Sequence, residues 1–204
     1  MIVVHHLDDS RSQRILWLLE ELGATYQVKR YQRTSAGLAP KALLHVTPLG
    51  KSPVITDGDV TLAESSAIIE YLINKYSVDG KLKAPSSGPE YLNNLYFLHF
   101  AEGFMAQDVR QTATALFRQV QKQRIEPEIK KYAAFVEAHL QEVDWFAGGP
   151  GPTAADFAMS FPLECLALIK MAGPKCLAYV SRIQARPAYL RALERGESRY
   201  AYKL

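Results

Sequence analysis

The sequence predicts two domains, an α/β N-terminal half and an all-helical C-terminal half. Three observations support this. Residues 1–78 hold short apolar runs that alternate with strong helical patterns, residues 79–90 are rich in Gly, Pro and Ser, and residues 91–204 show helical spacing without a convincing strand. Alternating strands and helices indicate a layered α/β unit, whereas sustained helical periodicity indicates a bundle. Residues 79–90 are therefore expected to be a linker.

The first elements are expected to be a strand, a loop and a helix. Ile2–Val4 is a short apolar run typical of a buried strand, and the polar His5–Asp9 is expected to be a loop. Ser10–Leu22 has a broad apolar face, and Gly23 stands where helices stop. Ser10 also has the spacing of a capping box with Gln13.

The rest of the N-terminal half completes the sheet. Alternation predicts a second strand at Tyr26–Tyr31, and Pro40–His45 is expected to be a short helix. Residues 47–69 then predict a turn, a hairpin centred on Asp57-Gly58 and a helix that opens at Glu64-Ser65. A β-α-β unit followed by a hairpin and a covering helix is an α/β arrangement of thioredoxin type.

The C-terminal half is expected to contain helices only. Apolar spacing predicts them at about 91–123, 125–143, 153–171, 176–184 and 189–195. Thr153 and Asp156 have capping-box spacing at the start of the third of these helices.

Composition excludes several classes of function. The chain has 204 residues, 48% hydrophobic and 22% charged, with a net charge of +3 spread along the sequence, which argues against a nucleic-acid partner. It has no run long enough to span a bilayer, so no membrane partner is expected. Its two cysteines, Cys165 and Cys176, form no disulfide framework and favour a reducing, cytoplasmic compartment. No His or Cys cluster has metal-binding spacing, so no metal is expected.

Four patches in order resemble the cytosolic glutathione S-transferase family, and the resemblance covers essentially the whole chain. They are Ser10–Arg14, Thr47–Pro53, Glu64-Ser65 and Thr153–Asp156. The match is most similar to the serine-type members of bacteria and fungi. It implies a thioredoxin-like glutathione-binding domain (1–78), a linker (79–90) and an all-helical domain (91–204). It also implies a cytoplasmic, homodimeric detoxification enzyme, a transferase that uses glutathione as co-substrate.

The resemblance places glutathione on the stretch between Lys51 and Ser65. Pro53 is similar to the family's cis-proline, and Ser52 before it would pair its backbone with the cysteinyl unit. Glu64 and Ser65 are similar to the pair that binds the γ-glutamyl end, where a helix N-terminus favours an anion. Lys51 would bind the glycyl carboxylate. Each assignment has an ordinary structural alternative. Pro53 can be a trans proline of an edge strand, Glu64 and Ser65 can simply cap the helix, and Lys51 can be a solvated surface lysine.

The reaction needs a thiolate, and the resemblance assigns its stabilisation to Ser10. A free thiol has a pKa near about 8.5, and lowering it by roughly two units takes about 2.7 kcal/mol. One hydroxyl bond to a charged acceptor supplies roughly 1.5–3 kcal/mol. The rival interpretation is that Ser10 caps its helix, with Ser12, His5 or His6 as other candidate donors.

The resemblance implies that glutathione is joined to a hydrophobic electrophile. The pocket for this electrophile is expected under the helix at 91–123, with candidate lining residues Phe104, Met105, Val109 and Phe117. Two other functions remain open on the same fold. One is glutathione-dependent peroxide reduction, isomerisation or disulfide reduction, and the other is a non-catalytic glutathione-transferase-like binding module.

Overall fold

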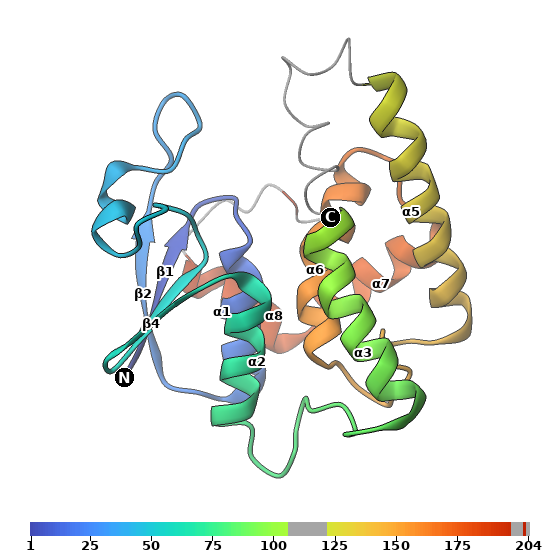
Figure 1. Ribbon diagram of the computed structural model, residues 1–204, viewed down its shortest axis with the longest axis horizontal. Coiled ribbons are helices and arrows are strands. Elements are labelled where there is room, and N and C mark those ends of the chain that lie inside the picture. Colours follow the sequence, from blue (N-terminus) through green and yellow to red (C-terminus); the bar gives the residue numbers. More distant parts are fainter. Residues whose placement is uncertain (106–121, 197–201, 203–204) are drawn as a thin grey trace. The chain divides into compact units, whose positions relative to one another are not determined.

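The computed structural model describes residues 1–105, 122–196 and 202, with side chains except at 104–105 and 122–125. The described residues form two compact units, one of residues 1–83 together with the helix at 187–196, the other of the remaining helices. The first unit is a thioredoxin-like α/β domain and the second is helical, as the sequence predicts (Figure 1).

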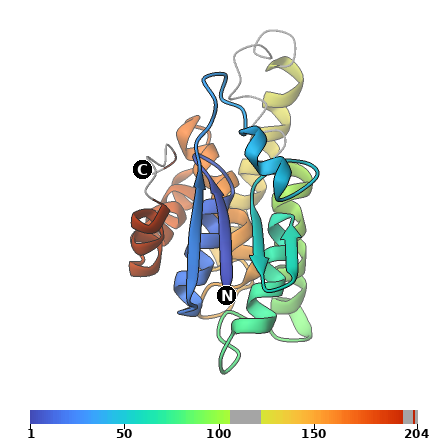
Figure 2. The same ribbon diagram turned by 90° about the vertical axis from the view of Figure 1, so that its left-hand side faces the viewer.

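A four-stranded mixed sheet is the centre of the first unit. Its strands are β1 (Ile2–Leu7), β2 (Tyr26–Tyr31), β3 (Val54–Asp57) and β4 (Val60–Ala63), in the order β2-β1-β3-β4. β1 runs parallel to β2 and antiparallel to β3, and the β3–β4 pair is an antiparallel hairpin. Figure 2 faces this sheet and shows its strands side by side.

One expectation for the start of the chain is wrong. The predicted loop at His5–Asp9 begins with three strand residues, because β1 extends to Leu7 and pairs with β2 along its full length. Both histidines are buried there, so two polar side chains that suggested a loop lie inside the domain. The predicted hairpin is present, and its turn lies one residue later than expected, since Asp57 pairs with Val60.

Helices α1 (Ser12–Leu22) and α2 (Ser65–Tyr76) pack beside each other and against the sheet. Gly23 ends α1 in the left-handed conformation at φ 65°, as its position predicts. The predicted capping box between Ser10 and Gln13 is absent, because α1 starts two residues later than expected and Arg11 stands at its N-cap without a side-chain cap bond. A 3-10 turn, η1 (Lys41–His45), replaces the predicted short helix and buries Leu43 against Leu7 and Tyr31.

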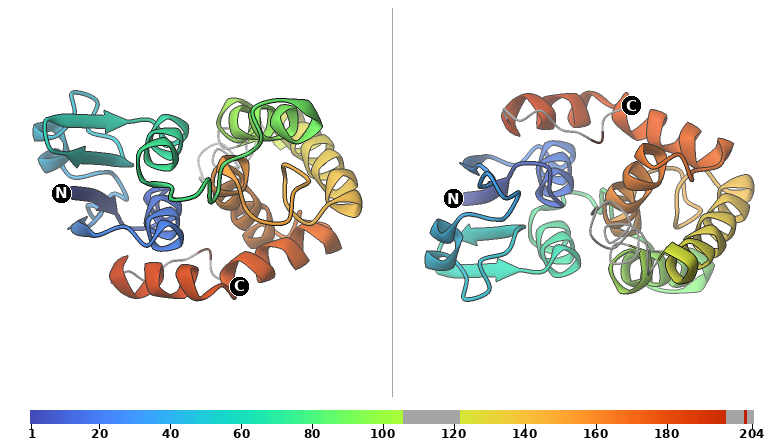
Figure 3. Two further views of the ribbon diagram at one scale, coloured as in Figure 1. Left: turned by 90° about the horizontal axis from the view of Figure 1, so that it is seen from below. Right: turned by 90° about the horizontal axis from the view of Figure 1, so that it is seen from above.

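The last helix, α8 (Pro187–Gly196), belongs to the first unit and packs along α1 (Figure 3). Arg186 Nη2 donates to Glu21 Oε2 at 3.0 Å across 165 residues of sequence. The indole N–H of Trp17 donates to the same carboxylate at 3.0 Å, and the Trp17 ring meets Tyr189 edge to face. These buried rings and paired charges stabilise the packing of α8 against α1.

The second unit contains the other helices. They are α3 (Gly88–Phe100), the π-helical turn η2 (Ala101–Met105), α5 (Lys122–Glu142), α6 (Ala154–Leu168) and α7 (Pro174–Gln184). The predicted capping box at Thr153 is present, and the Asp156 carboxylate accepts the Thr153 N–H at 2.8 Å. It also accepts the Phe146 N–H and the Tyr179 hydroxyl, at 3.0 and 2.9 Å. None of the helices in the described ranges is long and apolar enough to cross a membrane.

Candidate functional site

The loop before β3 presents an open piece of backbone. The Ser52–Pro53 peptide bond is cis, which confirms the sequence prediction, and Pro53 is buried. The Ser52 hydroxyl donates to the carbonyl of His5 at 3.2 Å, so this side chain is engaged by β1. Among the described residues, none hydrogen-bonds the Ser52 N–H or C=O. An extended peptide can therefore pair with Ser52 through the main chain.

The start of α2 presents a second set of unused donors. No side chain caps this helix, and its N-cap residue, Glu64, has φ 72° and ψ 119°. Non-glycine residues rarely adopt such a positive φ, which costs of order 1–3 kcal/mol and is typical of functional sites. Ser65 is 2% exposed, and its Oγ is buried without a hydrogen-bond partner among the described residues. An uncapped helix N-terminus with an unused hydroxyl favours a bound anion.

These two features face one hollow in the first unit. Its lining residues are Arg11, Thr47, Leu49, Lys51, Ser52, Pro53, Ala63, Glu64 and Ser65. All five predicted glutathione-binding residues are among them. Arg11, Thr47, Leu49 and Ala63 line the hollow as well, although their residue types alone did not assign them to a site. Arg11, Thr47 and Leu49 had a signal, because they lie in the patches Ser10–Arg14 and Thr47–Pro53, whereas Ala63 meets the hollow only through the fold.

Ser10 lies at the edge of this arrangement, 6% exposed. Its hydroxyl donates to the Leu7 carbonyl at 2.7 Å and accepts the Ser12 N–H at 3.2 Å. Its Oγ lies 2.8 Å from Ser12 Oγ and 3.5 Å from Ser52 Oγ. The hydroxyl thus bridges the end of β1, the start of α1 and the cis-proline loop.

The alternative donors lie deeper. Ser12 is fully buried, and its Oγ accepts the Leu7 N–H at 3.3 Å and lies 2.8 Å from His6 Nδ1. His6 is also fully buried, and burial lowers its pKa to about 4, although Asp8 and Asp9 act to raise it. His5 Nδ1 lies 3.0 Å from the Tyr31 hydroxyl, and burial, with the charge of Lys29, lowers its pKa as well. Both imidazoles are therefore neutral at pH 7.

The predicted electrophile residues are not described. Val109 and Phe117 lie outside the described residues, as do the side chains of Phe104 and Met105. In the described part of the chain, no group of three His, Cys, Asp or Glu side chains could hold a metal ion.

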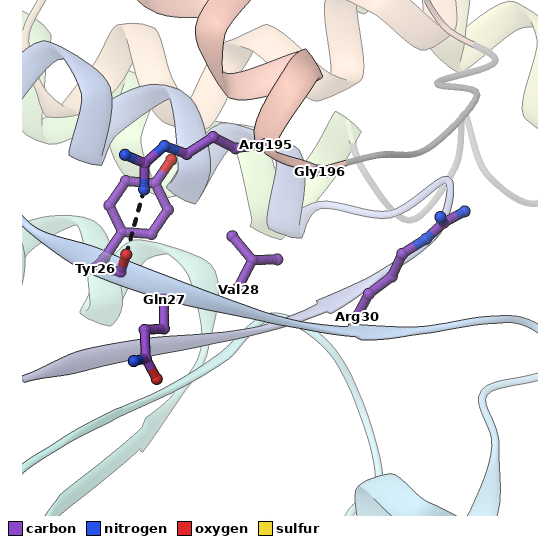
Figure 4. A pocket seen from close by; sticks show the side chains of 6 residues that line it. All are labelled: Tyr26, Gln27, Val28, Arg30, Arg195 and Gly196. Carbon is purple, nitrogen blue, oxygen red and sulfur yellow. Dashed lines mark hydrogen bonds between the residues drawn. The ribbon is translucent and has the colours of Figure 1, made fainter.

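A second hollow lies beside β2 and the end of α8, and none of its lining residues lines the first hollow (Figure 4). Its arginines are already engaged. Arg30 donates to both oxygens of Asp8 at 2.7 and 3.0 Å, and Arg195 donates to the Tyr26 carbonyl at 3.3 Å. Arg195 also lies over the Tyr26 ring and 3.2 Å from Glu20. We therefore place the candidate site at the first hollow.

Comparisons with known proteins agree with this fold. Residues 1–74 match the model of the glutathione S-transferase N-terminal domain. Glutathione S-transferase 3 of Schizosaccharomyces pombe is 36% identical over 180 residues, 80% of this chain and 73% of that protein. Glutathione S-transferase 1 of Saccharomyces cerevisiae is 27% identical over 207 residues, 89% of this chain and 88% of that protein.

Solved structures show the same fold. A glutathione S-transferase from Actinobacillus pleuropneumoniae has a TM-score of 0.85 and 32% identity, covering 99% of this chain and 95% of that one. A glutathione transferase from Phanerochaete chrysosporium, in complex with oxidized glutathione, has a TM-score of 0.80 at 24% identity, with 96% of each chain covered.

The fold and the hollow define a thioredoxin-like domain, followed by a helical domain, with a helix N-terminus and the open backbone of the cis-proline loop facing one site. With these relatives, the chain belongs to the glutathione S-transferase family and is an enzyme of that family.

Proposed function

We propose that this enzyme binds glutathione in the hollow at Ser52 and Ser65, stabilises its thiolate through Ser10 and joins it to hydrophobic electrophiles. The observation that supports this most is the buried, unpartnered Oγ of Ser65 at the uncapped start of α2. A buried hydroxyl without a partner costs free energy unless a ligand supplies one. The γ-glutamyl carboxylate is such a partner.

The other lining residues match the remaining groups of glutathione. Glu64 is exposed at the hollow and offers a carboxylate to the γ-glutamyl ammonium. The open N–H and C=O of Ser52 suit the cysteinyl backbone. Lys51, exposed on the same hollow, suits the glycyl carboxylate. The tripeptide therefore meets a donor or a charge of the right sign at each end.

Ser10 is the thiolate donor that the geometry favours. Its Oγ lies within 3.5 Å of the side chain of Ser52, whose backbone would hold the cysteinyl unit. Ser12 lies behind it, between His6 and Leu7. In this proposal the Ser10 proton turns from the Leu7 carbonyl to the sulfur, and the protein is a serine-type member of the family.

The proposal includes the biological setting. We infer a homodimer, and support comes from exposed apolar side chains on α3, where Leu92 and Tyr96 are 61% and 51% exposed. Large exposed apolar groups often mark an interface. A cytoplasmic, detoxifying role on hydrophobic electrophiles, bound near Phe104, Met105, Val109 and Phe117, completes the proposal. Light scattering tests the dimer, and cell fractionation tests the compartment.

Calorimetry with two thiol ligands tests the binding site. Glutathione should bind, and Ser65→Ala should weaken its affinity by roughly tenfold, since a hydrogen bond to a charged group is lost. Cysteinylglycine lacks the γ-glutamyl unit, so its weaker affinity should be the same in both proteins. Thr61→Ala, at an exposed position of β4, is the control. No glutathione binding at millimolar ligand would favour a non-catalytic scaffold.

A panel of model electrophiles, hydroperoxides and mixed disulfides tests the reaction. Turnover of electrophiles supports the transferase reaction. Turnover confined to hydroperoxides or disulfides would replace it with the corresponding reduction.

A further inference from the structure

A chain of hydrogen-bonded side chains, here called the file, leads from the interior of the first unit to the hollow. His6 Nδ1 lies 2.8 Å from Ser12 Oγ, and Ser12 Oγ lies 2.8 Å from Ser10 Oγ. Ser52 Oγ follows at 3.5 Å. The members come from β1, the start of α1 and the cis-proline loop. Because a hydroxyl has one proton, the direction of each bond in this file depends on its neighbour.

The inner end of the file is a sealed imidazole. His6 is fully buried, and the last turn of α8 covers it, since a Cβ at Gly196 would lie 3.3 Å from His6 Nε2. The charges acting on it are Asp8 and Asp9, which favour the protonated ring, and Arg30, which opposes it. Burial outweighs them and keeps the ring neutral at pH 7. A neutral imidazole carries its proton on one nitrogen only, so the ring has to be in one of two tautomers.

The tautomer of His6 determines the acceptor to which the Ser12 hydroxyl donates its proton. Ser12 Oγ already accepts the Leu7 N–H at 3.3 Å. If Nδ1 of His6 carries the proton, it donates to the remaining lone pair of Ser12 Oγ. The Ser12 proton then points to its nearest other acceptor, Ser10 Oγ at 2.8 Å, with the Leu7 carbonyl farther away at 3.3 Å.

The orientation of the Ser12 hydroxyl in turn determines the acceptor to which the Ser10 hydroxyl donates. Ser10 Oγ accepts the Ser12 N–H at 3.2 Å, and a second bond from the Ser12 hydroxyl fills its other lone pair. The Ser10 hydroxyl can then only donate, to the Leu7 carbonyl at 2.7 Å, to Ser52 Oγ at 3.5 Å or to a sulfur that arrives in the hollow. In the opposite tautomer, with the proton on Nε2, the Ser12 hydroxyl donates to His6 Nδ1. Ser12 Oγ can then accept the proton of the Ser10 hydroxyl, which is no longer directed toward the sulfur.

We propose that His6 is a positioning residue: as the Nδ1–H tautomer it orients Ser12, and Ser12 commits the Ser10 hydroxyl to donation toward the glutathione thiolate. This rests on the thiolate role of Ser10 proposed above. His6 makes no contact with glutathione in this scheme. Its effect therefore shows in the thiol pKa and hardly in the affinity for glutathione.

A matched pair of amide substitutions at position 6 tests the scheme. In His6→Asn the side-chain amide nitrogen can occupy the place of Nδ1, whereas in His6→Gln it reaches the place of Nε2 and leaves Ser12 without its donor. The readout is the apparent pKa of the bound glutathione thiol, followed by thiolate absorbance against pH. His6→Gln and Ser12→Ala should lower the thiolate fraction at a fixed pH below that pKa by roughly fivefold. In His6→Asn the thiolate fraction should stay close to that of the wild type.

The controls separate this scheme from a structural role and from the role of Ser10. Circular dichroism and calorimetry with glutathione verify that each variant is folded and binds. An equal loss in His6→Asn and His6→Gln, or no loss in His6→Gln, would overturn the positioning role. If Ser10→Ala alone leaves the thiol pKa unchanged, the Ser10 proposal fails instead. If Ser10→Ala raises it, adding His6→Gln should raise it no further, and an additive rise would overturn the action of His6 through Ser10.

Discussion

Ser10 Oγ lies 3.5 Å from Ser52 Oγ, although 42 residues separate them in the sequence. The pair joins the turn just before α1 to the residue before the cis proline. A cysteinyl unit that pairs with the Ser52 backbone would therefore hold its sulfur beside the Ser10 hydroxyl. In the proposed function, binding and activation of the thiol meet at this point, and the first two predictions separate them.

Ser10→Ala should slow catalysis and leave binding nearly unchanged. The substitution removes one hydrogen bond to a charged sulfur, so kcat/KM should fall by roughly 10- to 100-fold at neutral pH. The Kd for glutathione should change by less than about twofold, because the γ-glutamyl and backbone contacts remain. Steady-state kinetics with an active electrophile and calorimetry provide the two numbers. Turnover at the wild-type level would reject Ser10 as the thiolate donor, and Thr61→Ala serves as the control.

Lys51→Ala should weaken glutathione binding in a salt-dependent way. Lys51 is exposed, so its attraction for the glycyl carboxylate is modest, about 0.2–1 kcal/mol, or roughly a 1.4- to 5-fold rise in Kd. The difference from wild type should shrink in about 1 M salt, where the screening length falls to roughly 3 Å. Calorimetry at two salt concentrations measures both effects.

Lys83→Ala is the matched control, since it removes an equal charge from an exposed position that does not line the hollow. An equal effect of the two substitutions would mean that only the net charge matters. Lys51→Arg should retain the affinity.

Asp57 should make the first unit sensitive to acid. Its Oδ2 accepts bonds from Lys75 at 2.7 Å, Tyr71 at 2.8 Å and Tyr76 at 2.5 Å, which tie α2 to the end of β3. Burial acts to raise the pKa of Asp57, but these bonds outweigh it and lower the pKa to about 2. The unfolded chain, with a pKa of 3.8, binds more protons at low pH, so stability falls as pH drops from about 4 to about 2.

Asp57→Asn should therefore cost about 1–3 kcal/mol at pH 7, and this cost should shrink toward pH 2. Urea unfolding at pH 7, 4 and 2 measures the difference. Asp59→Asn, in the exposed turn of the same hairpin, should behave as wild type throughout. A cost that stays constant with pH would contradict the charge-based explanation.

Gly173 and Glu137 should be coupled in the second unit. The Glu137 carboxylate accepts the N–H groups of Lys175 and Cys176, at 2.7 and 3.0 Å, at the start of α7. A Cβ at Gly173 would lie 2.5 Å from the Glu137 carboxyl carbon. Gly173→Ala should therefore cost roughly 1–3 kcal/mol, because the carboxylate has to leave these amides.

A double-mutant cycle verifies the cause. In a Glu137→Ala background, adding Gly173→Ala should cost much less, since the clashing group is gone. Gly151→Ala, where a Cβ meets no atom within 4 Å, should stay within about 0.5 kcal/mol of wild type. Additive losses at positions 173 and 137 would show that the penalty has another origin.

Local chemistry made much of this fold predictable from the sequence. Gly23 ends a helix because a left-handed residue suits it, and Thr153 with Asp156 starts one because their spacing satisfies free amides. The same reasoning misplaced the start of α1, where Ser10 had the spacing of a cap. The Ser10 hydroxyl donates instead to Leu7, a partner available only because β1 extends farther than its polar residues suggested.

The sequence by itself determined the α/β and helical halves, the hairpin and five of the residues that line the hollow, Lys51, Ser52, Pro53, Glu64 and Ser65. These depend on backbone sterics, short-range hydrogen bonds and a family pattern, all of which lie within short stretches of chain. Only the tertiary structure decided the burial of His6, the packing of α8 on α1 and the approach of Ser10 to Ser52. Those depend on contacts between distant segments, and their energies arise from burial and partner geometry that no single stretch contains.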